Sequence, residues 1–187
     1  MHARTRCSIP LLVALFSWLP GAQAADWNYR LGEDAPAFSL KALDGKVLSS
    51  EDLRGHYAVL SFMTTWCPFC NASAPHFQKL FQDYRDRGVR VLIVDIDERN
   101  KPVKAFVAKH GLTCPILMDA DGKIATLYAP PKEFIPDLER QEVMIASFAI
   151  IDPAGKVRFL TLNDKPEEFD ARLTKLRSRL DELLAAK

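Results

Sequence analysis

The chain has 187 residues, of which 48% are hydrophobic and 26% charged, and its formal net charge at pH 7 is +1. The length is enough for one domain with its own hydrophobic core. The near-neutral charge argues against a nucleic-acid partner, because binding to a phosphate backbone needs a basic surface.

The first two dozen residues have the layout of a secretory signal peptide. Two arginines precede an apolar stretch at residues 9–19, and a small-x-small cleavage site follows at Ala22-Gln23-Ala24. The apolar stretch is about half of the ~20 residues that span a bilayer, so an uncleaved anchor is the less favoured alternative. We therefore expect a signal peptide at 1–24, a mature domain at 25–187 and a periplasmic location.

The next segments alternate between strand and helix patterns. A hairpin is expected around the Asp44-Gly45 turn, and a short helical turn at 50–53. The continuous apolar run at 57–63 predicts a central strand that is buried on both faces. A helix is then indicated by one apolar stripe that ends before Gly88 and consists of Phe77, Leu80, Phe81 and Tyr84.

The second half continues this alternation. Strands are expected at 89–96 and 115–118, and helices at 101–110 and 124–128. Residues 129–142 hold three prolines and many charges, which indicates a surface loop. Two further strands, at 144–151 and 157–162, precede a final amphipathic helix through Phe169, Leu173, Leu176, Leu180 and Leu183. This order predicts an α/β sandwich with a mixed central sheet.

The segment Trp66-Cys67-Pro68-Phe69-Cys70 lies between a predicted strand and a predicted helix. The free N–H groups and partial positive charge of a helix N-terminus favour a thiolate, so we expect Cys67 to be an exposed nucleophile with a lowered pKa. Pro68 fits the first helical turn. Cys70, more buried and within bonding reach, is expected to resolve the mixed disulfide. A structural disulfide is the alternative, but closing so short a loop stabilises little.

The cysteine count supports redox chemistry over a scaffold or a metal site. Outside the signal peptide there are three cysteines, Cys67, Cys70 and Cys114. Exported disulfide scaffolds have larger, even sets, and a structural zinc site needs four ligands, whereas the chain has no second CxxC. We therefore expect a redox-active Cys67–Cys70 disulfide, no metal and no cofactor, with Cys114 as a core residue.

Several segments carry a family resemblance: 32–40, 43–46, 53–55, Trp66 to Cys70 with Pro75 after it, 119–123 and 150–156. Over nearly all of 25–187 the chain resembles the TlpA-like thioredoxin-fold thiol:disulfide oxidoreductases of the redoxin superfamily, related to AhpC/TSA proteins. The resemblance implies a thioredoxin-like three-layer sandwich and reduction of disulfides in exported proteins. It also implies electrons from a membrane-embedded thiol transporter. We expect a monomer with Trp66, Pro68, Phe69 and Ala146 as active-site neighbours.

The chain departs from that family at three places. The family often has Glu three residues after the second cysteine, where this chain has Ser73. The family's cis-proline corresponds to Ala146, whose peptide is expected to be trans because a non-proline cis bond costs ~2.5–4 kcal/mol. A proline of 130–136 is the other residue that could face the site. The 129–142 stretch is longer than usual, and it either selects partners or is a plain surface insertion.

Two other functions remain open at this point. A peroxiredoxin-like thiol peroxidase would carry the motif Pro-x-x-x-Thr/Ser-x-x-Cys, with a proline seven residues before its cysteine. Thr64 matches the Thr/Ser position before Cys67, but Leu60 stands at the proline position. A copper-binding thiol chaperone would use the same two cysteines, since soft thiolates select Cu(I). The CxxC spacing alone leaves the direction of electron flow open.

Overall fold

The computed structural model describes residues 30–162 and 166–186, so the expected signal peptide lies outside the described residues. Its main sheet has the strand order β5-β4-β3-β6-β7. The strands are β3 (Ala58–Met63), β4 (Arg90–Ile96), β5 (Ile116–Asp119), β6 (Ser147–Ile151) and β7 (Val157–Leu160). β3, β4 and β5 are parallel, whereas β6 is antiparallel to β3 and β7 to β6. The mixed central sheet is therefore confirmed.

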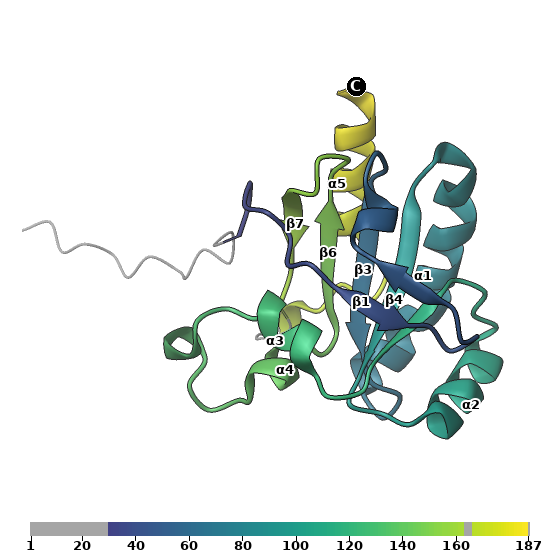
Figure 1. Ribbon diagram of the computed structural model, residues 1–187, viewed down its shortest axis with the longest axis vertical. Coiled ribbons are helices and arrows are strands. Elements are labelled where there is room, and N and C mark those ends of the chain that lie inside the picture. Colours follow the sequence, from purple (N-terminus) through teal and green to yellow (C-terminus); the bar gives the residue numbers. More distant parts are fainter. Residues whose placement is uncertain (1–29, 163–165, 187) are drawn as a thin grey trace, which may run out of the picture.

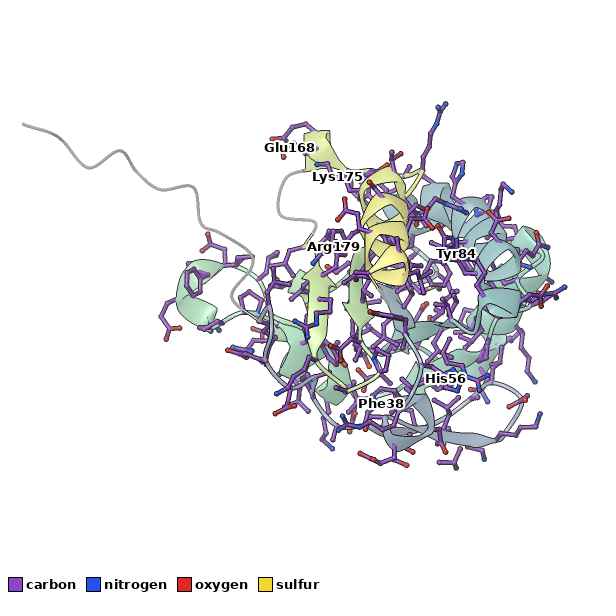
Figure 2. All side chains as sticks on the ribbon, turned by 90° about the horizontal axis from the view of Figure 1, so that it is seen from above. Phe38, His56, Tyr84, Glu168, Lys175 and Arg179 are labelled. Atoms are coloured by element: carbon purple, nitrogen blue, oxygen red, sulfur yellow. The ribbon has the colours of Figure 1, made fainter. Side chains whose placement is uncertain are left out.

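Helices and a hairpin cover the two faces of this sheet, which gives three layers (Figure 1). The helices α1 (Pro68–Tyr84), α2 (Asn100–His110) and α5 (Thr174–Ala185) contribute to one core, and the β1 (Ser39–Lys41)–β2 (Val47–Ser49) hairpin region and α3 (Lys123–Tyr128) border the other. Figure 2 shows Tyr84 and Arg179 on one side of the sheet and Phe38 on the other. Short 3-10 helices lie at 51–53, 85–87, 132–134 and 166–168.

β3 explains why there are two cores. All six of its residues are buried, and successive side chains point to opposite faces of the sheet. Val59 and Met63 belong to the cysteine-side core, which also holds Cys67 and Cys70, whereas Leu60 and Phe62 belong to the hairpin-side core. Burial on both faces is what the uninterrupted apolar run at 57–63 predicted.

The structure corrects three of the predicted elements. Residues 144–146 form a turn, so β6 begins at Ser147 and not at Met144. The last helix begins at Thr174, because Leu173 has a left-handed φ of +60° and ends the preceding loop. The 129–142 stretch is mostly loop and projects from the sheet in Figure 1, but it includes the start of α4 (Arg140–Val143). Among the described residues, no helix has both the length and the hydrophobicity to cross a membrane.

Candidate active site

The cysteine pair lies at the junction of β3 and α1, at the carboxyl end of the central strand. Cys67 is the N-cap of α1, and its sulfur accepts a hydrogen bond from the backbone N–H of Cys70 at 3.4 Å. Pro68 occupies the first turn, where an N–H would have no partner within the helix. The expected placement of Cys67 at a helix N-terminus, with Cys70 in the first turn, is therefore confirmed.

The two thiols have opposite pKa shifts. The pKa of Cys67 is lowered to about 6, chiefly by the hydrogen bond from the Cys70 thiol and also by the N–H groups of Cys70 and Phe69, against an opposing effect of burial. The pKa of Cys70 is raised by its hydrogen bond to Cys67, by burial and by the negative charge on Cys67. At neutral pH Cys67 is a thiolate and Cys70 a thiol.

The accessibility of the pair differs from the prediction. Cys67 and Cys70 are each only 3% exposed, so the expectation of an exposed Cys67 is wrong. Phe69, which is half-buried, packs with its ring centroid 4.9 Å from that of Phe169. Trp66, in contrast, is 67% exposed and extends into solvent beside Cys67.

Asn71 fixes the turn that carries Cys67. Its side-chain amide donates to the carbonyl oxygens of Thr65 and Cys67, both at 2.9 Å. Its Oδ1 lies 2.8 Å from Lys109 Nζ and 3.1 Å from His110 Nε2, at the end of α2. One half-buried side chain thus joins the active-site turn to a second helix.

The side chain of Glu98 anchors the same turn through hydrogen bonds to Thr65. Glu98, just after β4, accepts from the backbone N–H of Thr65 at 2.5 Å and from its hydroxyl at 2.6 Å. Glu98 also faces the buried carboxyl of Asp95 on β4. Sequence patterns did not single out Asn71, Glu98 or Asp95, although a charged residue inside the apolar run 89–96 was a signal for Asp95.

Ala146 lies on the other side of the Cys70 thiol. The backbones of Thr64 and Ala146 both contact that thiol, so the predicted neighbour is in place. No cis peptide bond occurs in residues 30–162 or 166–186, as expected for Ala146, and no proline of 130–136 supplies one. Ala146 instead has a left-handed φ of +65°, and its N–H donates to the carbonyl of Phe62 at 2.9 Å.

The other two residues singled out in the sequence, Ser73 and Cys114, are both buried. Ser73 is buried, and its hydroxyl donates to the carbonyl of Cys70 at 3.3 Å. Cys114 is 5% exposed in the cysteine-side core, and burial raises its pKa to about 12. Within the described part of the chain, no three His, Cys, Asp or Glu side chains gather as metal ligands would.

Comparison with known proteins agrees with this geometry. The profile of the AhpC/TSA family matches residues 31–160. The thiol-disulfide oxidoreductase ResA of Bacillus thuringiensis is 32% identical over 131 residues, which cover 68% of this chain and 76% of that protein.

Solved structures show the same architecture. The secreted Mycobacterium tuberculosis disulfide oxidoreductase homologous to Escherichia coli DsbE is 26% identical, with a TM-score of 0.60 over 80% of this chain and 96% of that one. A thioredoxin-family thiol:disulfide interchange protein of Chlorobium tepidum has a TM-score of 0.58 at 24% identity over 76% and 94% of the two chains, which is a likeness of fold. The chain belongs to the AhpC/TSA family and is a thiol–disulfide oxidoreductase of the thioredoxin fold.

Proposed function

We propose that the Cys67–Cys70 pair reduces disulfides of other exported proteins, with Cys67 as nucleophile and Cys70 as resolving thiol. The observation that carries this proposal is the opposite pKa shift of two thiols three residues apart: that of Cys67 is lowered to about 6 and that of Cys70 is raised. Thiolate character and nucleophilicity together set the rate of attack on a disulfide, so the sequence of events begins at Cys67.

The exchange has two steps. The Cys67 thiolate attacks one sulfur of the partner's disulfide, a new S–S bond forms, and the partner's other sulfur leaves as a thiolate. Cys70 then loses its proton and attacks the Cys67 sulfur, which closes the Cys67–Cys70 disulfide and releases the partner with two thiols. The partner gains two electrons, so a dithiol donor must reduce the pair again; a membrane-embedded thiol transporter is the donor class we propose.

The surroundings of the pair favour a polypeptide over a small oxidant as substrate. Cys67 is buried while the neighbouring Trp66 is 67% exposed. A large aromatic ring in solvent provides apolar contact area for a docked chain, and exposed aromatic side chains are enriched at protein interfaces. Docking on this ring would bring a partner's disulfide to the covered sulfur.

Cysteine variants test the function directly. Cys67→Ser should abolish reduction of insulin disulfides, whereas Cys70→Ser should trap covalent mixed disulfides that a reductant releases. Cys114→Ser is the control and should keep nearly full turnover, because that thiol is buried in the core. A wild-type protein that consumes hydrogen peroxide faster than it reduces insulin would overturn the proposal in favour of a thiol peroxidase.

The location outside the cytoplasm rests on the signal-peptide pattern at 1–24. The Mycobacterium relative is described as secreted, which supports the same proposal for this chain. Mass spectrometry of the protein from its native host should give a mature N-terminus at Ala25. Recovery of an intact Met1 species from the cytosol would contradict it.

A further inference from the structure

Asn71 makes four side-chain contacts, two at each end of its amide. The Nδ2 group donates to the carbonyl oxygens of Thr65 and Cys67, both at 2.9 Å, whereas Oδ1 lies 2.8 Å from Lys109 Nζ and 3.1 Å from His110 Nε2. A primary amide can donate twice and accept twice, so its hydrogen-bonding capacity is fully used. Lys109 and His110 have no role in the exchange steps described above.

These two residues of α2 determine the orientation of the amide. The lysine side chain has only donors, so the atom of Asn71 that faces Lys109 is the oxygen. The pKa of His110 is lowered, first by burial and second by the charge of Lys109, so its imidazole is neutral at pH 7. A neutral imidazole has one N–H group. Because Nε2 of His110 faces an oxygen, the proton is on Nε2 and His110 is a second donor.

The opposite orientation of the amide would be unfavourable at both ends. It would set the Asn71 oxygen against the carbonyl oxygens of Thr65 and Cys67, which can only accept, and the NH2 group against the Lys109 ammonium group. The Cys67 carbonyl would then keep only the backbone N–H of Asn71, which lies 3.0 Å away. The donors on α2 therefore decide whether the Asn71 side chain binds or repels the cysteine turn.

The fold of α2 holds Lys109 and His110 at this position. They lie in the last turn of the helix, where the negative end of the helix dipole favours cations, and Gly111 ends the helix with a left-handed φ of +60°. The ring centroid of His110 is 4.5 Å from that of Phe106, which is buried in the cysteine-side core. Both donors thus come from a packed helix and not from a loop.

The orientation of the Cys67 carbonyl matters for the Cys67 sulfur. The N–H groups of Cys70 and Phe69 lower the pKa of Cys67, and their direction depends on the peptide that follows Cys67. Asn71 binds the carbonyl oxygen of that peptide. Among the described residues, the titratable side chains that are hydrogen-bonded to the 64–70 turn or to Asn71 from other elements are Glu98, Lys109 and His110.

We propose that Lys109 and His110 are positioning residues for disulfide exchange, which fix the Asn71 amide against the cysteine turn and so keep Cys67 an activated nucleophile. This inference rests on the proposed function. The covalent steps remain those of Cys67 and Cys70, and no bond forms or breaks at α2.

Lys109→Glu tests the orientation directly, because a carboxylate attracts the NH2 end of the Asn71 amide and so reverses it. Lys109 is exposed, so the variant should fold. The pH midpoint of Cys67 alkylation by iodoacetamide, about 6 in the wild type, should rise by about 0.5–1 pH unit. At pH 5, alkylation should therefore be about threefold to tenfold slower than in the wild type.

Lys104→Glu is the matched control, because it makes the same change of charge at another exposed position of α2 and should leave the midpoint unchanged. A double-mutant cycle with Asn71→Leu separates orientation from charge. In the Asn71→Leu background, Lys109→Glu should cause no further shift, since the side chain through which it acts is gone. An equal shift with and without Asn71 would mean that the charge acts on Cys67 through space, and would overturn the positioning role.

His110 is tested by a pair of variants. His110→Leu removes the second donor and should raise the midpoint in the same direction, whereas His110→Gln retains an NH2 donor and should restore it. An unchanged midpoint in Lys109→Glu or in His110→Leu would overturn the role of that residue. Failure of the proposed function would be seen separately, as continued reduction of insulin by Cys67→Ser, whatever the midpoints of the α2 variants.

Discussion

Two turns meet at the Cys70 thiol, and they are held in different ways. The first, from Thr64 to Cys70, is fixed by side chains from elsewhere in the fold, with Glu98 bound to Thr65 and Asn71 bridging to α2. The second, Met144 to Ala146, is held by backbone bonds, from Met144 to Gln141, from Ile145 to Glu142 and from Ala146 to Phe62, with Ala146 in a left-handed conformation. The first turn sets the chemistry of the sulfurs, whereas the second stores backbone strain beside them.

The two turns should therefore affect different properties of the protein, the first the pKa of Cys67 and the second its stability. A thiolate with a lowered pKa needs donors that stay in place, which the hydrogen bonds of the first turn provide. The groups that lower the pKa of Cys67 are Cys70 and Phe69, which both belong to the first turn. Substitutions in the strained turn should therefore alter stability more than the acidity of Cys67.

Ala146→Pro should destabilise the protein by about 2–3 kcal/mol, because proline fixes φ near −65° and removes the N–H that bonds to Phe62. Urea unfolding of the reduced protein measures this loss. Stability equal to the wild type would show that the second turn can adopt the family's proline geometry without a penalty, and that the fold does not need the left-handed conformation of Ala146.

Asn71→Leu should cost about 1–2 kcal/mol, since the Thr65 carbonyl loses its side-chain donor and the Cys67 carbonyl keeps only the backbone N–H of residue 71. The pH dependence of alkylation by iodoacetamide gives the second readout. In the wild type the rate should fall as pH drops through about 6, where the Cys67 thiolate takes up a proton. In Asn71→Leu this midpoint should move to higher pH, because the loosened turn aims its N–H groups less well at the sulfur.

Gln82→Leu, at an exposed position of the same helix, is the control for Asn71→Leu and should leave the alkylation midpoint unchanged. An unchanged midpoint in Asn71→Leu as well would mean that Asn71 supports stability only, and that the first turn keeps its geometry without the bridge to α2.

Ala146→Gly should stabilise the protein by about 0.5–1 kcal/mol, because glycine adopts a left-handed φ without the penalty that alanine carries. Ala72→Gly, at an exposed position of α1, should have the opposite sign, since glycine weakens a helix. The alkylation midpoint of Cys67 should stay near pH 6 in Ala146→Gly. A shift there would show that the two turns are coupled.

Much of the fold could be predicted because local rules are strong around the cysteines. A continuous apolar run, a proline in the first helical turn and Gly88 with its left-handed φ of +74° mark β3 and both ends of the α1 segment. The errors arose where hydrophobicity alone was the guide. Met144 and Ala146 are as buried as strand residues but lie in a turn, and burial does not distinguish the two.

The site was predicted less completely than the fold. The position of the two cysteines follows from spacing and helix position, but the packing of Phe69 depends on Phe169, which comes from the distant loop before α5. The partners of Asn71 and Glu98 are likewise contributed by α2 and the β3–α1 loop. Such contacts join segments more than 30 residues apart, and no local pattern encodes them.

The arrangement of the chain around β3 has a practical consequence for attaching the protein to surfaces or fusion partners. The segment 32–35 bonds to residues 155 and 157, and Tyr57 bonds to Leu183 near the end of α5. Both contacts lie at the end of the sheet where β3 begins, whereas Cys67 follows the end where β3 finishes. A linker joined ahead of residue 32 or after α5 would therefore leave the cysteine turn pointing away from the support, free to meet a large partner.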